Sequence, residues 1–223
     1  TPPNPYTTLF RSSMKGLALL CVNPLHIPHK TMVKSLAIHG LQINTSVEIP
    51  HFRYLIVLKV IGVSMWPSSL LNNFLNTSLQ RVNTTSSLSI NNCSLFYLQH
   101  PMFENLVHMS VLNIQFNPLQ MLGNRIFSSL RKLRHLNLSY TNITLLDNKL
   151  FISNTQLLTL DISNTKLHSL NFMVLDRLSS LSGLYISQMP LSLPNVQGKA
   201  GLCTFSTIRT AHVTHAELCC LFR

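Results

Sequence analysis

Hydrophobic residues recur along this chain with a 24-residue period. Three successive segments, beginning at Leu133, Leu157 and Leu181, carry apolar side chains at the first, fourth, sixth and eleventh positions of one pattern. Two earlier segments, beginning at Thr85 and Met109, keep the same step. A period of this length predicts a solenoid, because one unit cannot bury its hydrophobic face alone and must stack on a neighbour.

The second half of each unit repeats as well. Two series of large apolar residues recur at 24-residue intervals: Leu98, Leu122, Leu146, Leu170, and Phe103, Phe127, Phe151, Leu175. A third series, Leu106, Leu130 and Leu178, has Asn154 as its exception. Each unit therefore predicts a short strand, a turn and a convex segment. We expect an α/β repeat fold, a curved solenoid with a parallel sheet on its concave side and irregular or short helical segments on its convex side.

The amino-terminal part of the chain keeps the pattern but not the 24-residue step. Earlier units begin at Val33 and Leu55, a 22-residue step, and the next unit follows after a 30-residue step. The longer step predicts a convex excursion over residues 67–81. At the other end the register is predicted to continue on the 24-residue step through Phe205, Ile208, Thr210 and Val213.

The units resemble the extracellular leucine-rich-repeat family, whose typical 24-residue unit follows LxxLxLxxNxL. The resemblance covers about residues 33–213. It departs at the ninth position, where the family has Asn and this chain keeps it only at Asn117. Three other residues there can bond to the turn: Thr141, Thr165 and Cys93. Three cannot do so well: Leu41, Val63 and Met189.

The chain divides into four parts on this basis. Residues 1–12 are set aside, because Pro5 to Ser12 resembles the in-frame translation of a sequencing-library adapter. Residues 13–32 resemble a truncated amino-terminal cap, in which Cys21 precedes residues similar to Leu-x-x-Pro; a shortened secretory leader over residues 14–22 is the alternative. Residues 33–213 form the solenoid, and residues 214–223 begin a Cys-Cys hinge or a carboxyl-terminal cap.

The charge composition excludes several functions. Charged residues make up 10% of the chain, and 17 Lys and Arg outnumber 6 Asp and Glu. Because the six carboxylates are scattered, we expect no enzyme activity, no cofactor and no metal site. The densest basic run is Arg131-Lys132-Leu133-Arg134, which lacks interleaved aromatic residues and a second cluster. It is typical of a solvated loop, so we expect no nucleic-acid partner.

Glycosylation sequons indicate an extracellular location. Six sites match N-x-[ST]: Asn44, Asn76, Asn83, Asn92, Asn137 and Asn142. Asn92 and Asn137 fall on predicted strands and are expected to be poor acceptors. We predict that the chain lies on the extracellular side of the plasma membrane as part of a longer receptor, or is secreted if it ends here. A cytosolic repeat protein is the alternative.

The five cysteines fall into two groups. Cys93 occupies the ninth position of its unit and is predicted to be a buried turn thiol. The other four lie near the ends and are candidates for disulfides: Cys21, Cys203, Cys219 and Cys220. His212 and His215 with the last two cysteines contain ligand types that zinc prefers, but an oxidising compartment favours disulfides.

The adjacent Cys219 and Cys220 resemble the junction that ends the repeats in leucine-rich-repeat G-protein-coupled receptors, the relaxin-receptor and glycoprotein-hormone-receptor group. This resemblance implies a ligand-binding ectodomain that reaches the membrane and a G protein only through parts absent here. Toll-like receptors usually show an Asn-Pro and a Cys-x-Cys, and neither lies near this end. A Toll-like or adhesion receptor and a non-receptor interaction scaffold remain the alternatives.

Function on such a scaffold depends on the concave surface. Residues between the inward leucines are predicted to bind an extracellular protein or peptide: Phe116, Arg134, Tyr140, Asp161 and Tyr185. Aromatic side chains on a rigid sheet bury a large area at low entropic cost. The alternative is that these aromatic side chains only cover their neighbours.

Overall fold

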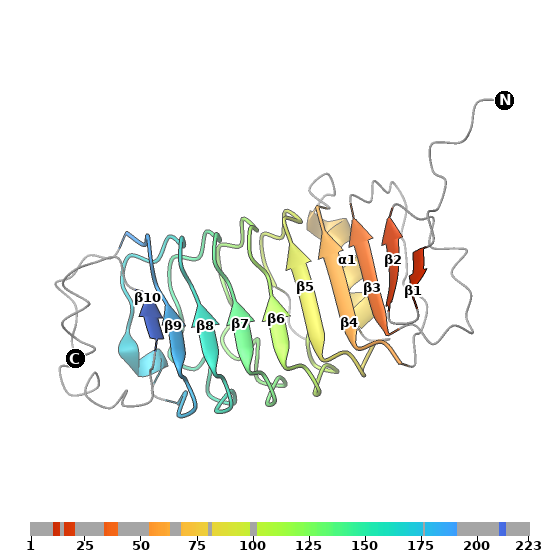
Figure 1. Cartoon of the computed structure of the whole chain (residues 1–223). Helices are drawn as coiled ribbons and strands as arrows, with labels where there is room; N and C mark the ends of the chain where they lie inside the picture. Colours follow the sequence, from red (N-terminus) through yellow and green to blue (C-terminus); the bar gives the residue numbers. More distant parts are fainter. Residues whose placement is uncertain are drawn as a thin grey trace.

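The computed structural model describes residues 11–13, 16–20, 34–39, 54–62, 68–79, 82–98, 102–175, 177–190 and 210–212. Within these residues, ten strands form one sheet whose order follows the sequence (Figure 1). The strands are β1 (Arg11–Ser13), β2 (Gly16–Leu20), β3 (Ser35–His39), β4 (Val57–Ile61), β5 (Ser87–Asn91), β6 (Val111–Asn113), β7 (His135–Asn137), β8 (Thr159–Asp161), β9 (Gly183–Tyr185) and β10 (Thr210–His212). All neighbours are parallel except β1 and β2.

The strand register confirms the predicted repeat steps over most of the chain. From β5 to β9 the inward leucine of each strand pairs with the leucine 24 positions later, beginning with Leu88 and Leu112. Before them come a 22-residue step, from Leu36 to Leu58, and a 30-residue step, from Leu58 to Leu88. The sheet also extends two strands before the first predicted repeat, since β2, inside the predicted cap, pairs with β3, and β1 pairs with β2.

The last strand departs from the predicted register. The sequence pattern aligns Thr210 with Ile186, whereas the structure pairs Thr210 with Gly183, a 27-residue step. The predicted 24-residue step is therefore wrong at this end. Phe205 lies 24 residues after Leu181, and Ile208 lies 27 residues after it. Either apolar residue could therefore be the first position of the last unit, so hydrophobicity alone did not distinguish the 24-residue step from the 27-residue step.

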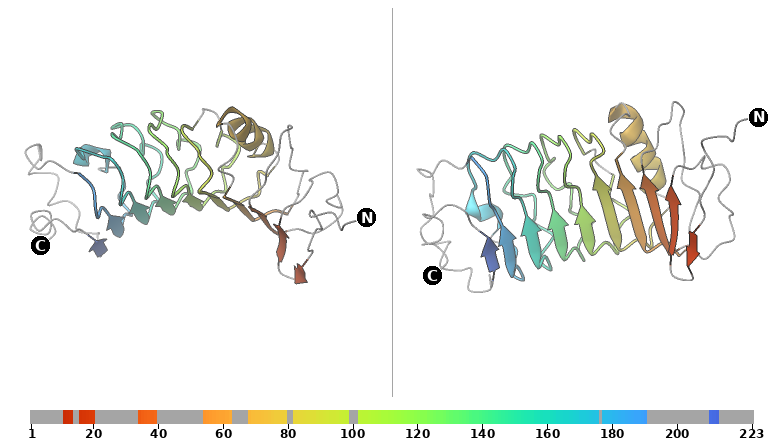
Figure 2. Two further views of the ribbon diagram at one scale, coloured as in Figure 1. Left: turned by 90° about the horizontal axis from the view of Figure 1, so that it is seen from above. Right: turned by 45° about the horizontal axis from the view of Figure 1, so that its top comes forward.

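The sheet lines the inner side of a curved solenoid, and the convex side carries little regular structure (Figure 2). Helix α1 (Ser68–Leu79) fills the predicted excursion over residues 67–81. Its Leu75 and Leu79, one turn apart, are fully buried against the core. A 3₁₀ helix, η2 (Phe172–Val174), lies on the convex side of a later unit.

The core lies between the sheet and the convex segments. Side chains alternate along the strands between the core and the concave surface. The inward leucine at the second residue of β4 to β9 is buried in every case: Leu58, Leu88, Leu112, Leu136, Leu160 and Leu184. On the convex side Phe127 stacks between Phe103 and Phe151, with ring centroids 6.2 and 6.1 Å away. These contacts confirm the predicted fold class, an α/β repeat solenoid.

Asn154, the exception in the third apolar series, is also buried. Its Nδ2 donates hydrogen bonds to the carbonyl oxygens of Phe127 and Leu130, at 3.0 and 2.9 Å. Both carbonyls belong to the preceding repeat. A polar side chain is stable at this core position because it satisfies backbone acceptors that would otherwise lose water without replacement.

Candidate ligand-binding surface

The turn that follows each strand requires left-handed backbone at the eighth position of the unit. Six residues at this position have positive φ: Gly62, Asn92, Phe116, Tyr140, Asn164 and Gln188. Glycine and asparagine adopt this conformation readily, whereas a bulky side chain is disfavoured there. Phe116 and Tyr140, with φ of 57° and 55°, are therefore unusual occupants.

Phe116 and Tyr140 form an exposed aromatic stack. Their ring centroids are 4.4 Å apart and the ring planes meet at 22°. They are 48% and 49% exposed. The backbone fixes their spacing, because Phe116 N donates to Ser139 O at 3.2 Å and Tyr140 N donates to Ser163 O at 3.0 Å. Two aromatic faces are thus presented to solvent from a rigid support.

Asn117 anchors the turn beneath this stack. Its Nδ2 donates to the carbonyl oxygens of Ile90 and Ile114, at 2.7 and 2.8 Å. Its Oδ1 accepts hydrogen bonds from the backbone N–H groups of Cys93 and Leu95, at 2.9 and 3.1 Å. The amide therefore ties its own repeat to the preceding one.

The residues that replace asparagine at the ninth position form hydrogen bonds as predicted, but to fewer backbone groups than Asn117. Thr141 and Thr165 each donate from Oγ1 to a carbonyl three residues earlier, at 2.8 and 2.9 Å. Met189 also receives a hydrogen bond, since Thr165 Oγ1 lies 3.2 Å from its Sδ. Cys93 Sγ lies within hydrogen-bond distance of the carbonyl oxygens of Val60 and Asn91, at 3.3 and 3.1 Å, and is fully buried, which confirms the predicted buried turn thiol.

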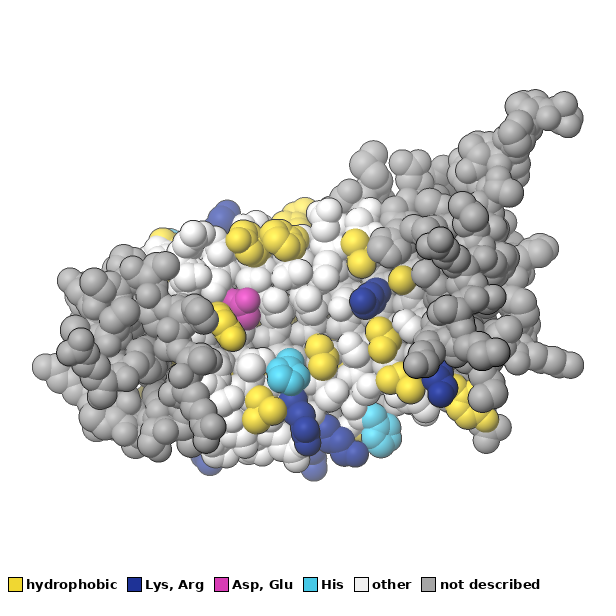
Figure 3. Space-filling model, in the orientation of Figure 1, with side chains coloured by type: hydrophobic (Ala, Val, Ile, Leu, Met, Phe, Trp, Pro, Cys, Tyr) yellow, Lys and Arg dark blue, Asp and Glu magenta, His cyan; other side chains and the backbone are white. Residues whose placement is uncertain are grey.

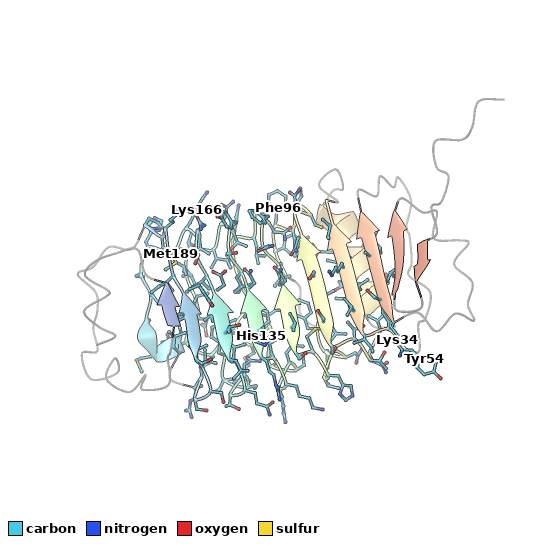
Figure 4. The ribbon with its side chains drawn as sticks, viewed as in Figure 1. Lys34, Tyr54, Phe96, His135, Lys166 and Met189 are labelled. Atoms are coloured by element: carbon cyan, nitrogen blue, oxygen red, sulfur yellow. The ribbon has the colours of Figure 1, made fainter. Side chains whose placement is uncertain are left out.

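More exposed apolar side chains follow the same turns. Tyr97, Met121 and Leu145 recur on the 24-residue step and are 39%, 67% and 58% exposed. Tyr97 and Met121 pair as a parallel bridge, and Gln120 N donates to Phe96 O at 3.1 Å. Phe96 is labelled at the edge toward which the strands point (Figure 4). We name the six exposed apolar residues after β5 to β7 the apolar rim: Phe96, Tyr97, Phe116, Met121, Tyr140 and Leu145.

Sequence reasoning identified two of these six residues and missed the other four. It considered only side chains inside the eleven-residue pattern, whereas Tyr97 and its equivalents occupy the thirteenth position. A test for apolar residues in the polar part of the period would have found them, because the 24-residue spacing of Tyr97, Met121 and Leu145 is visible in the sequence.

The other predicted ligand residues lie apart from the rim. Asp161 and Tyr185 are register partners on β8 and β9, and both are half-buried. Asp161 Oδ1 accepts a hydrogen bond from Ser163 N at 3.0 Å, so this carboxylate also supports its own turn. Arg134 is exposed where β7 begins, at the opposite edge of the sheet. The five predicted residues therefore form two pairs and one separate cation.

The sequons differ in their surroundings. Asn83 is exposed in a turn before β5. Asn92 is exposed as well, and its placement on a strand is wrong: β5 ends at the preceding residue because the turn requires positive φ. Asn137 does lie on β7, where Nδ2 donates to Gln115 Oε1 at 3.1 Å and Oδ1 accepts from Ser139 N at 2.9 Å.

The remaining sites of interest are only partly described. Asn76, on α1, and Asn142 are half-buried, while Asn44 lies outside the described residues. The four predicted disulfide cysteines also lie outside them: Cys21, Cys203, Cys219 and Cys220. Within the part of the chain that the structure describes, no helix is both long and apolar enough to cross a bilayer.

Comparison with known families agrees with this geometry. A family model described as "Leucine rich repeat" matches residues 83–143. No curated protein matches the sequence. The matched segment contains β5 to β7 and every rim residue except Leu145. Residues 83–143 therefore match the leucine-rich-repeat family, and the parallel-sheet solenoid is consistent with that fold, an architecture that typically serves as an interaction scaffold.

Proposed function

We propose that this chain is the binding part of an extracellular receptor and takes a protein or peptide on its apolar rim and adjoining concave surface. The single observation that carries the proposal is the exposed stack of Phe116 on Tyr140. Large aromatic side chains dominate binding energy at protein interfaces because they bury much area with few rotatable bonds.

The backbone conformation of the pair supports this proposal. Left-handed backbone costs about 1–2 kcal/mol for a residue with a β-carbon. A stacked aromatic pair returns about 0.5–1.5 kcal/mol beyond area burial. The stack alone therefore offsets at most about one of the two strained residues in the unbound protein. Strain of this kind concentrates at binding sites, where the conformation presents a side chain to a ligand.

Charge supports a partner with acidic groups. Among the described residues the acids are Glu104, Asp147 and Asp161, and the lysines and arginines outnumber them. Lys59 is exposed on β4, and the alternation along this strand places its side chain on the concave side. An acidic partner would approach faster, while apolar side chains on it would supply contacts with the rim.

A peptide library tests the rim while the natural ligand is unidentified. Random twelve-residue peptides displayed on phage would be selected on the secreted chain. The selected peptides should bind a double variant, Phe116→Asn with Tyr140→Asn, at least about tenfold more weakly, as expected for a hot spot. Asparagine suits the left-handed turn, so the variant should keep its fold.

A control variant separates the rim from general hydrophobicity. Ile152 and Met173 are exposed outside the rim, at 42% and 62%. The change Ile152→Asn with Met173→Asn should leave the selected peptides bound. If no peptide is enriched, or if the peptides bind the rim variant as well as the unchanged chain, the rim is not the binding surface.

The extracellular location has its own test. Asn83 should be glycosylated when the chain is secreted from animal cells, because it is exposed in a turn. Asn137 should stay unmodified, because both ends of its amide are hydrogen-bonded on the sheet. Enzymatic deglycosylation in ¹⁸O water followed by mass spectrometry measures both sites. An intact natural protein with no occupied sequon would favour a cytosolic scaffold.

Within the receptor class we propose the G-protein-coupled group. The support is the resemblance of Cys219 and Cys220 to the junction that follows the repeats in those receptors. Sequencing the natural transcript past Arg223 tests it. Seven apolar spans after the cysteines would support the group. A single span with a globular cytoplasmic domain would indicate a Toll-like or adhesion receptor, and an early stop would remove the signalling role.

A further inference from the structure

The sheet edge opposite the apolar rim carries a cluster of basic side chains. Three successive repeats contribute exposed residues just before β6 and around the start of β7. We name these the basic strip: His108, Arg131, Lys132, Arg134 and His135. Dark blue and cyan groups gather at this edge in Figure 3, and His135 is labelled on the same side in Figure 4.

The repeat geometry brings basic side chains from different units together. Lys132 and His108 occupy the same position in successive units, and Lys132 Nζ lies 3.4 Å from His108 Nδ1. His135 Nδ1 lies 2.8 Å from Thr159 Oγ1, which holds its ring on the sheet. Arg131 and Lys132 extend from the turn between these histidines in sequence. The strip is therefore a positively charged row that follows the stacking direction.

A depression of about 570 Å³ adjoins the strip. Its lining includes Arg131, Lys132 and His108 together with three hydroxyl groups, those of Ser128, Ser129 and Ser153. Of its ten lining residues one is acidic, Glu104. Among the described residues no acid forms an ion pair with Arg131, Lys132 or Arg134. The three cations thus remain available to an external anion. The hydroxyls of Ser128 and Ser153 lie beside them, while the Ser129 hydroxyl donates to Phe103 O at 2.8 Å.

We propose that the basic strip binds a sulfated polysaccharide, with successive sulfate groups contacting Arg131, Lys132 and Arg134. The guanidinium groups can bond two sulfate oxygens at once, as they do with phosphate. The strip contains no Phe, Tyr or Trp side chain, the larger rings on which bases stack, which disfavours single-stranded nucleic acid. The choice of a sulfated glycan, in preference to RNA, rests on the proposed extracellular location.

Heparin is the probe for this proposal, and its affinity should depend on salt. Each cation that displaces a counterion from a polyanion contributes about one unit to the slope of log affinity against log salt. The triple variant Arg131→Ala, Lys132→Ala, Arg134→Ala should lower that slope by about two to three units. It should weaken binding at least about tenfold at 0.15 M salt, measured by surface plasmon resonance on the secreted chain.

Two control variants separate a local site from net charge. The variant Lys149→Ala, Lys166→Ala, Arg177→Ala removes the same charge from exposed positions outside the strip and should keep most of the affinity. The variant Glu104→Gln should bind heparin more tightly, because it removes the one carboxylate that lines the depression. Circular dichroism checks that each variant is folded.

Several outcomes would overturn the proposal. Equal losses in the two triple variants would show that only net charge acts, and unchanged binding in the strip variant would exclude the strip. Equal affinity for RNA and heparin would indicate a general polyanion surface, and full affinity for desulfated heparin would exclude sulfate recognition. Because the strip variant keeps the apolar rim, its peptide binding reports separately on the proposed receptor function.

Discussion

Two aromatic stacks run along this solenoid with the same 24-residue period and different surroundings. Phe103, Phe127 and Phe151 stack inside the core and are at most 1% exposed. Phe116 and Tyr140 stack at the sheet edge and are about half exposed. The period brings rings into register in both cases. The position within the period decides whether a stack lies in the core or faces solvent.

The backbone differs between the two stacks as well. None of the three buried phenylalanines has a positive φ, whereas both exposed aromatics do. The rings of the exposed pair also lie closer together, at 4.4 Å against about 6 Å in the core. In the core, buried leucines share the packing with the rings, while the exposed pair has solvent on its outer face.

The largest test of this comparison removes the centre of the buried stack. Phe127→Ala should lower the free energy of unfolding by about 3–5 kcal/mol, because it removes a fully buried ring and leaves a cavity between two others. Chemical denaturation followed by circular dichroism measures it. A loss below about 1 kcal/mol would mean that the buried stack contributes no more than a surface pair, and the comparison would break.

A smaller loss of stability is expected when the side-chain amide of Asn117, which lies between the exposed stack and the core, is removed. Asn117→Ala should cost about 2–4 kcal/mol, because it leaves buried donors and acceptors of two repeats without partners. Thr141→Ala, which removes a single hydrogen bond within one repeat, should cost about 1 kcal/mol. Both losses are measured by chemical denaturation. Equal losses in the two variants would contradict the assignment of Asn117 as the link between repeats.

The smallest effect is expected at the exposed stack. Tyr140→Asn should be more stable than Tyr140→Ala by about 0.5–1 kcal/mol, because asparagine tolerates the left-handed turn better. Both should differ from the unchanged chain by less than about 1.5 kcal/mol, the contribution of a stacked pair. Thermal unfolding compares the three proteins. If alanine proved the more stable replacement, the left-handed backbone would not be the source of strain.

The extent of sequence prediction can be judged from particular residues. The 24-residue recurrence predicted the pairing of Leu88 with Leu112 and the burial of Phe127, because leucine and phenylalanine in fixed phase must face a common core. Prediction failed where the chain is irregular. Thr210 lies three positions out of its expected register, because Phe205 and Ile208 fit the first position of the last unit equally well in the sequence.

The candidate surface was predicted less completely than the core. Phe116 and Tyr140 were identified because they lie inside the repeat pattern, whereas Met121 was missed although it is 67% exposed. The pattern describes inward positions, and exposure of an apolar residue outside it depends on how the turn carries the chain past the sheet edge. Asp161 shows the same limit, because its bond to Ser163 became visible only in three dimensions.

The sequence by itself determined the repeat, the concave sheet and the inward hydrophobic residues, because these follow from periodicity, and periodicity is a property of the chain. Only the tertiary structure decided which side chains from different repeats meet. Stacking places residues 24 positions apart side by side, and this contact paired Phe116 with Tyr140 and Lys132 with His108. The physical reason is that binding surfaces depend on distances between repeats, which no single repeat encodes.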